Sequence, residues 1–305
     1  MLSIKKRPAN SGGNAKETLR AVIFNADDFG LNSSANAGIR TCHEKGVVLS
    51  TSLMSTGEAF DEAVDYASRT PSLDTGLHLA LCETRPVSDP CEIPSLISDG
   101  GLFAPNFAAF LKLYLCGAIQ LHEVEREFRA QVKKALDTGL RITHLDSHQH
   151  LHALPSILEI VIRLAVENKI PSVRCPDERR APVMAALREG RVGRAMQRFA
   201  LSTASRLGRR SIACSRVATT DHFLGFMEMG RWKECSLRAG IQSLPPGLAE
   251  ICCHPRQEPE PSAGSDFPGE ITALTSDGLK LFLEKSKVQV TSFREYFTLR
   301  SQAGA

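Results

Sequence analysis

The sequence predicts an α/β protein folded as a single (β/α) barrel, on three observations. Short β-rich runs alternate with helical runs along the chain, and 305 residues is a normal length for one such barrel. Runs such as "AVIF" and "AEICC" are apolar on both faces, as in buried parallel strands. A doubly wound open sheet is the alternative, but its usual glycine-rich first turn is missing from "NADDFG". We expect one domain over residues 19–305 and a flexible polar tail over residues 1–18.

Each element follows from its local pattern, in chain order. The first half predicts strands over 20–27, 47–55 and 73–81, with helices over 33–46 and 58–70 between them. Ser33 or Ser34 is the expected cap of the first helix, and Gly46 is expected to end it. Residues 82–103 are rich in Pro, Gly and Asp and predict a loop.

The second half continues the alternation. Helices are predicted over 121–139 and 154–169, the latter with Pro155 in its first turn. Strands are predicted over 141–148, 172–177, 217–225 and 248–256, with helical material between the last three. Seven strands are visible, so the barrel is expected to have seven or eight parallel strands.

Composition and charge exclude several classes of protein. A net charge of +3 gives no reason to expect a nucleic-acid partner. Neither a signal peptide nor a membrane span is apparent. The nine cysteines form no Cys-x-x-Cys pair, which indicates reduced thiols in a cytoplasmic protein and no zinc–thiolate site.

Polar side chains gather at the ends of the predicted strands, where parallel barrels carry their chemistry. A carboxylate, imidazole or guanidinium stands near the end of almost every strand, which isolated loop residues would not explain. In chain order the set is Asn25, Asp27, Asp28, Ser52, Ser55, Thr56, His78, Asp146, His148, Arg174, Asp177, Asp221, His222 and His254.

The adjacent carboxylates Asp27 and Asp28 suggest a metal site. Two neighbouring carboxylates repel each other unless a cation lies between or beside them. A divalent metal resolves the repulsion if one aspartate ligates it while the other accepts a proton. An ordinary turn or helix cap ending at Gly30 is the alternative for this stretch taken alone.

The stretch "HLDSHQHLH" (144–152) holds four histidines. In an extended chain, His148, His150 and His152 would lie about 7 Å apart, too far to share one ion. We therefore expect His148, nearest the strand end, to ligate, with Asp146 as a candidate partner for its other nitrogen. One Asp and two His would suit Zn, Co, Ni, Fe or Mn, and Mg less well.

The motifs "NADDFGLN" (25–32), "GLHLAL" (76–81), "THLDSHQHLH" (143–152) and "EICCHPR" (250–256) occur in this order, with a weaker "VRCPDERR" (173–180). In this combination the chain resembles the YdjC-like (ChbG/HpnK-type) carbohydrate deacetylases over residues 20–295. The resemblance implies a distorted (β/α) TIM-like barrel, often dimeric, that uses a divalent metal to hydrolyse N-acetyl groups of amino sugars.

The resemblance also implies roles for particular residues. Asp28, His78 and His148 would hold the metal, Asp27 would be the general base, and His254 the general acid. The metal is expected to be Mg or Zn, with Co, Ni and Mn as alternatives. We add Arg174, His150 and His222 as expected contacts of the acetylated sugar or glycolipid substrate, because they stand near strand ends.

The arginine-rich segment 179–216 departs from the family pattern in its length and charge. It predicts one or two solvated helices. It could alternatively form a lid over an anionic substrate or a surface that rests on anionic membrane lipid.

Three other functions remain open. A metal-dependent phosphoesterase would use the surplus histidines for a second metal, and aryl phosphates would reveal it. A non-haem iron oxygenase uses the same ligand types but sits on a different fold, and oxygen consumption would reveal it. A non-catalytic sugar-binding barrel would release no acetate.

Overall fold

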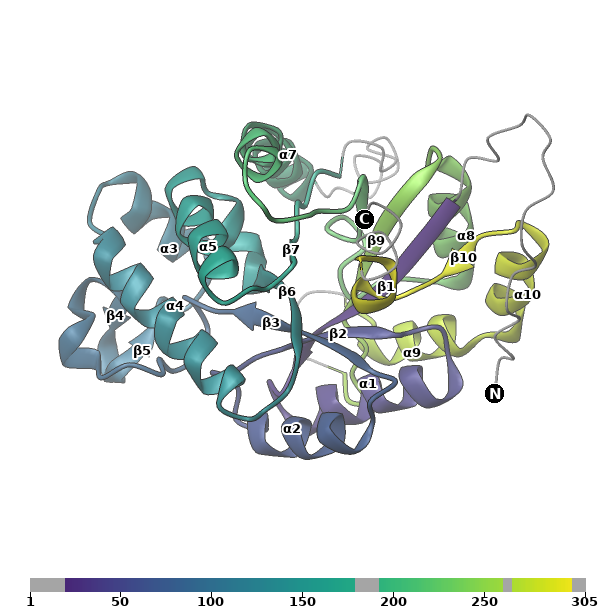
Figure 1. Cartoon of the computed structure of the whole chain (residues 1–305), viewed down its shortest axis with the longest axis horizontal. Helices are drawn as coiled ribbons and strands as arrows, with labels where there is room; N and C mark the ends of the chain where they lie inside the picture. Colours follow the sequence, from purple (N-terminus) through teal and green to yellow (C-terminus); the bar gives the residue numbers. More distant parts are fainter. Residues whose placement is uncertain (1–19, 179–191, 260–264, 298–305) are drawn as a thin grey trace.

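The structure, a computed structural model, describes residues 20–178, 192–259 and 265–297, so the expected tail over residues 1–18 lies outside it. Its centre is a parallel sheet with the strand order β7-β6-β3-β2-β1-β9-β8 and with β10 beside β1 (Figure 1). The strands of this sheet are β1 (Arg20–Phe29), β2 (Ser50–Leu53), β3 (Asp74–Leu79), β6 (Ile142–Ser147), β7 (Ser172–Val173), β8 (His222–Leu224), β9 (Gly247–Cys253) and β10 (Gln289–Val290).

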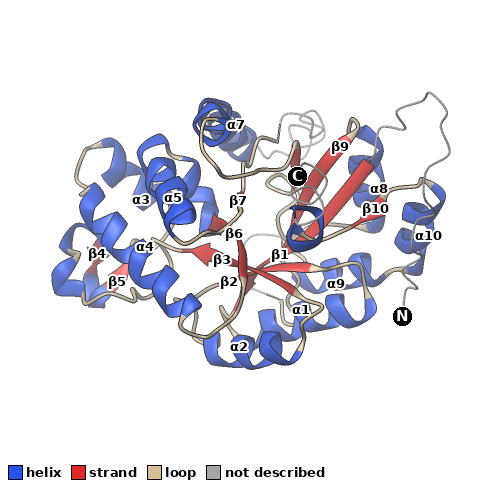
Figure 2. Cartoon of the chain, viewed as in Figure 1, coloured by secondary structure: helices blue, strands red, loops and turns tan. Residues whose placement is uncertain are grey.

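Helices lie outside the strands, as Figure 2 shows in blue against red. They are α1 (Ser33–Lys45), α2 (Phe60–Arg69), α3 (Phe107–Leu115), α4 (Leu121–Leu136), α5 (Pro155–Glu167), α7 (Val192–Ala213), α8 (Glu234–Ser243), α9 (Phe267–Thr275) and α10 (Asp277–Lys285). Helices α4 and α5 pack on the side of β3 and β6, whereas α1 and α9 pack on the side of β1. Two large apolar clusters fill these two spaces and hold the sheet rigidly from outside.

The sheet is curled into an incomplete barrel. Strand β1 pairs with β9 along one edge, and with β10 and then β2 along the other. A single parallel bridge joins Ser172 of the end strand β7 to Ala218, which precedes the other end strand, β8, by four residues. The predicted distorted (β/α) barrel is therefore confirmed, because successive strands are neighbours and the sheet bends round, as in a barrel.

The structure corrects the prediction for one helix cap and for one loop. The cap of α1 is Asn32, whose side chain accepts a hydrogen bond from the Ala35 amide, and neither Ser33 nor Ser34 caps the helix. Within the predicted loop 82–103 there is a small hairpin of β4 (Ile97–Ser98) and β5 (Leu102–Phe103).

The arginine-rich segment is described only in part. Helix α7 is a single helix covering 192–213, and residues 179–191 lie outside the described ranges. Phe199 and Leu207 of α7 are 72% and 62% exposed. No helix in the described part of the chain is both long enough and apolar enough to cross a membrane.

Candidate functional site

The carboxyl ends of β1, β3 and β6 bring the predicted carboxylates and imidazoles together. Asp27 and Asp28 lie at the end of β1, where Asp28 adopts a positive φ of 68°. His78 lies on β3 opposite Asp146 of β6, and His148 follows β6 directly. All five are buried. The turn at Asp28 lets two consecutive carboxylates face different partners.

Asp28 meets the two predicted histidine ligands. Its Oδ1 lies 3.0 Å from His148 Nδ1 and 3.5 Å from His78 Nε2. In each ring, the nitrogen that does not face Asp28 bonds another carboxylate. His78 Nδ1 lies 2.8 Å from Asp146, and His148 Nε2 lies 2.9 Å from Glu83. Asp146 therefore supports His78, whereas the sequence suggested that it would support His148. This carboxylate–histidine arrangement is the usual way in which ligating imidazoles are oriented.

The three groups fit a divalent cation. Donor atoms of Asp28, His78 and His148 all lie within 4.8 Å of one another. Burial opposes protonation of both rings, yet Asp146 and Asp27 raise the pKa of His78 to about 10, and Asp28 raises the pKa of His148 to about 9. The surrounding carboxylates thus stabilise positive charge at this position, and a bound cation would be stabilised in the same way.

Asp27 faces a different partner, the buried guanidinium of Arg174. Arg174 forms two parallel 2.6 Å hydrogen bonds to the Asp27 carboxylate. Asn25 Nδ2 and the Cys252 thiol also donate to it, at 2.8 and 3.1 Å. Burial alone would raise the pKa of Asp27, but Arg174 outweighs burial and holds that pKa well below its usual range. Asp27 is therefore an ionised, firmly oriented carboxylate.

Arg174 itself is a structural hub. It is 1% exposed and also bonds Asp146 at 2.7 Å and Glu250 at 2.7 Å. The sequence predicted a substrate contact here. The structure instead places Arg174 beneath Asp27, where it has no exposed surface for a sugar, so we assign it to the orientation of the carboxylates.

His254 approaches Asp27 from the end of β9. Its Nε2 lies 3.9 Å from Asp27 Oδ2 and 3.8 Å from Cys252 Sγ. Burial lowers the pKa of His254 to about 4. The backbone amide of His254 donates to Glu270 at 2.6 Å, which fixes the loop that carries the ring.

The remaining histidines of 144–152 separate into different environments. His144 stacks on Phe293 with 3.9 Å between ring centroids, and His152 bonds Ser147 Oγ and the Arg174 carbonyl. Both are therefore held inside the fold. His150 packs edge-on against Phe223 at 5.5 Å, and both of its ring nitrogens lack a hydrogen-bond partner among the described residues.

His222 is not brought into the site. It begins β8 level with Ala249 of β9, which is itself level with Val22 of β1. Asp27 lies five residues further along β1, or roughly 16 Å at the usual rise of a strand. His222 Nε2 instead lies 3.3 Å from the Pro246 carbonyl. We correct the predicted substrate contact at His222, because it stands at the opposite end of the strands.

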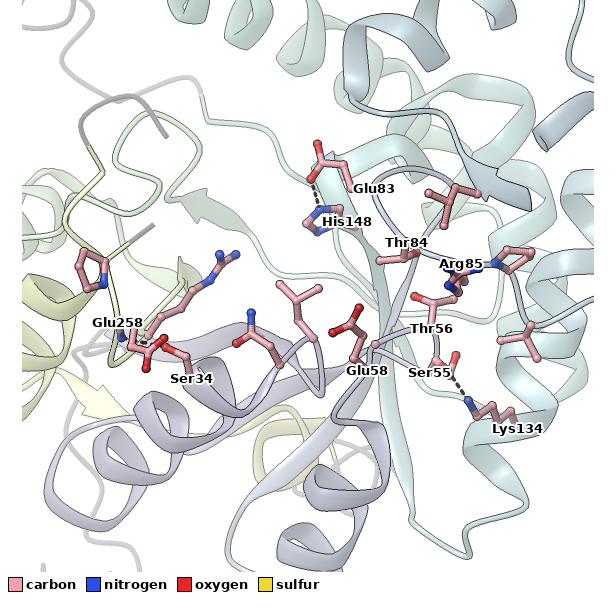
Figure 3. A pocket seen from close by; sticks show the side chains of 18 residues that line it. Ser34, Ser55, Thr56, Glu58, Glu83, Thr84, Arg85, Lys134, His148 and Glu258 are labelled. Carbon is pink, nitrogen blue, oxygen red and sulfur yellow. Dashed lines mark hydrogen bonds and ion pairs between the residues drawn. The ribbon is translucent and has the colours of Figure 1, made fainter. Parts of the chain in front are cut away.

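A cavity of about 1170 Å³ reaches the proposed ligand group at His148 (Figure 3). Its wall includes His148 and Glu83, which bond each other, and Arg256, which donates to Asp28 Oδ2 at 2.8 Å. Glu58, Glu258, Arg85 and Lys134 add further charged groups to the wall. A polar ligand of sugar size can thus reach His148 and Arg256, which both bond Asp28, from the cavity.

Glu83 and Glu250 are among the residues of this site that sequence reasoning missed. Glu83 lies in the predicted loop 82–103, where its positive φ of 66° is held by backbone bonds that join residues 83 and 84 to Ala104 and Phe103. Glu250 lies inside an apolar strand and gives no signal of its own; burial raises its pKa to about 7, against the opposing effect of Arg174.

Comparison with known proteins identifies a family to which the chain is similar. The model of the YdjC-like protein family matches residues 21–285. A carbohydrate deacetylase of Brevibacillus brevis is 43% identical over 155 residues, or 51% of this chain and 59% of that protein. The matched part thus spans about three fifths of that relative's length. A carbohydrate deacetylase of Geobacillus stearothermophilus is 29% identical over 287 residues, covering 92% of this chain and 99% of that protein.

The fold has a solved counterpart. An Enterococcus faecalis protein described as a cellobiose-phosphate cleavage protein superposes with a TM-score of 0.73 at 24% identity, covering 91% of this chain and 99% of that one. At this identity the likeness concerns the fold alone. The family match, in contrast, extends over most of the chain and includes each of the strands that bear the site. The chain therefore belongs to the YdjC-like protein family.

Proposed function

We propose that this protein is a metal-dependent hydrolase that removes acetyl groups from N-acetylated amino sugars, carried by an oligosaccharide or a glycolipid. The observation that carries the proposal is the position of Asp28. One of its carboxylate oxygens faces nitrogens of His78 and His148 beside a polar cavity, while the neighbouring Asp27 stands ionised and oriented by Arg174. Relatives described as carbohydrate deacetylases support the choice of substrate class.

Asp28, His78 and His148 would hold the ion, for which Zn and Mg are the first candidates and Co, Ni and Mn the alternatives. When bound there, a divalent ion supplies a Lewis acid for the acetyl carbonyl and lowers the pKa of water. Because Arg174 lowers the basicity of Asp27, a more acidic water is needed before Asp27 can accept its proton.

The protein side chains then divide the proton transfers. Asp27 accepts a proton from the attacking water. Because its carboxylate is already held in a fixed orientation, little conformational entropy is lost when the reactive geometry forms. Burial keeps the His254 ring neutral before the reaction, and its Nε2 lies 3.9 Å from Asp27 Oδ2, so His254 can take up the proton that Asp27 accepts from water and pass it to the departing amine nitrogen. Arg256 stays on Asp28 and keeps the second carboxylate oxygen directed away from the histidines.

Acetate release tests the function directly. We expect the full-length protein to release acetate from N-acetylated sugars or glycolipids, to lose this activity on chelation, and to regain it when the ion is restored. Metal content is measured on the same preparation. Release of phosphate from aryl phosphates without release of acetate would contradict the proposal and favour a phosphoesterase. A homodimer and contact of 179–216 with membrane lipid stay predictions.

Glu83 provides a test of the metal centre itself. Removing the carboxylate that holds His148 Nε2, in Glu83→Ala, is expected to weaken metal binding by about 10–100-fold. Glu83→Gln keeps an oxygen acceptor for the ring and should lose less. The apparent Kd is measured by titration against a competing chelator. Glu58→Gln, an exposed carboxylate in the same cavity wall, serves as the control. Equal affinity in Glu83→Ala and the wild type would refute this role.

A further inference from the structure

A second group of possible metal donors includes Asp27. It consists of Asp27 Oδ2, Cys252 Sγ and His254 Nε2. The distances between these atoms are 3.1 Å for oxygen to sulfur, 3.8 Å for sulfur to nitrogen and 3.9 Å for oxygen to nitrogen. In a tetrahedral zinc site with ordinary bond lengths, such donors are separated by about 3.4–3.6 Å. The three side chains therefore need to move by only a few tenths of an ångström.

We propose that Asp27, Cys252 and His254 form a second cation site, selective for thiophilic divalent ions such as zinc or cadmium. This site shares no donor atom with the group of Asp28, His78 and His148. His78 Nδ1 does approach Asp27 Oδ2 at 4.0 Å, but Asp146 already holds that nitrogen. Cys252 is not part of a Cys-x-x-Cys pair, so no sequence motif predicts a thiolate site here.

Binding is a simple exchange of a proton for the ion. The Cys252 thiol now donates its hydrogen to Asp27 Oδ2, and the ion would take the position of that hydrogen. The S–H bond breaks, a sulfur–metal bond forms, and the proton leaves to solvent. A divalent ion beside the Asp27 carboxylate and the Cys252 thiolate is then neutral as a unit, which removes the cost of a bare buried charge.

The guanidinium of Arg174 bonds the same Asp27 carboxylate and would repel a cation bound there. Each carboxylate oxygen has two acceptor positions, and Arg174 NH1 uses one of those on Asp27 Oδ2. The other is the one now filled by the thiol. Arg174 is also balanced by Asp146 and Glu250, so its charge is not left facing the proposed ion alone.

The consequence for activity rests on the proposed function. If Asp27 is the general base and His254 the general acid, an ion at this second site removes both at once. Excess zinc or cadmium should then inhibit, whereas excess magnesium should not, since a thiolate binds the soft ions and not the hard one. The first site would be filled at lower zinc concentration and support activity.

The test is a cadmium titration of the full-length protein, wild type against Cys252→Ser. Sulfur bonded to cadmium gives ultraviolet charge-transfer absorption, and the first site contains no sulfur, so it is silent. We expect the wild type to show one equivalent more of this absorption than Cys252→Ser, and we expect this difference to persist in excess magnesium, which a thiolate does not bind. The exposed Cys91, Cys116, Cys214 and Cys235 contribute equally to both proteins and cancel. Cys175→Ser, a buried thiol outside both sites, is the matched control.

Equal absorption in the wild type and Cys252→Ser would overturn the proposal. Should Cys252→Ser fail to fold, His254→Gln keeps the thiol and is expected to weaken the extra equivalent by at least about ten-fold. If the protein releases acetate, the zinc concentration for half inhibition should rise by a similar factor in Cys252→Ser. If it releases none, the proposed function fails, but the cadmium stoichiometry still decides the existence of the site.

Discussion

Replacing Asp27 by asparagine is expected to lower kcat for acetate release by about 10³-fold, the order typical of a lost general base, while the protein keeps its metal. Asparagine has nearly the same shape but cannot accept a proton from water. Asp27 is not among the donors of the first site, Asp28, His78 and His148, so the metal content should stay at the wild-type value.

The amide also disturbs the pair with Arg174. Both Asp27 oxygens accept from Arg174, and an amide nitrogen in place of one of them would point a donor at a donor. We therefore expect some loss of stability, and melting curves must accompany the kinetics. Asp137→Asn, on the surface beside Lys133, is the control that should leave kcat unchanged. Full activity in Asp27→Asn would show that another group is the base.

Replacing Arg174 by methionine is expected to lower the free energy of unfolding by about 3–5 kcal/mol, the cost of leaving a buried charge uncompensated. Three carboxylates, on Asp27, Asp146 and Glu250, would lose the guanidinium that they share. Arg174→Lys restores a charge but not the planar fork that meets Asp27 with two bonds, so an intermediate loss is expected. Urea unfolding measures the effect.

The same variant should show a pH dependence of known sign. Without the guanidinium, burial would raise the folded-state pKa of these carboxyls above their unfolded values. The folded state then binds more protons, so the stability defect should grow as pH rises from 5 to 8 and shrink in acid. Arg129→Met is the control, because Arg129 pairs with Glu125 and Glu167 at the surface and should cost no more than about 1 kcal/mol. A loss of under 1 kcal/mol in Arg174→Met would contradict the hub role.

Pattern-based reasoning reached much of the site because the chemistry lies at strand ends. Asp27, Asp28 and His148 each stand at the end of an apolar run, His78 stands inside one, and parallel strands end at one rim. Arg174 satisfies the same rule yet points into the protein, and His222 lies at the first residue of its strand. The strands are only a few residues long, so a small error in a predicted strand boundary moves a side chain from one end of the barrel to the other.

The partners of the site residues could not be predicted. Glu83 belongs to a loop whose position depends on the hairpin of β4 and β5, and its pairing with His148 spans 65 residues. In the sequence, nothing distinguishes Cys252 from the other cysteines. Its contact with Asp27 exists because β9 pairs with β1. Contacts of this kind depend on which strands become neighbours, which no local pattern contains.

By itself, the sequence determined the alternating α/β elements, the parallel barrel and the rim that carries the acidic and imidazole side chains, because hydrophobic periodicity and strand polarity are local properties. The tertiary structure alone decided the pairings: Asp146 with His78, Glu83 with His148, and Arg174 with Asp27. The physical reason is burial. A charge taken out of water must find its opposite partner within a few ångströms, and the curled sheet, not the order of residues, determines which partner is there.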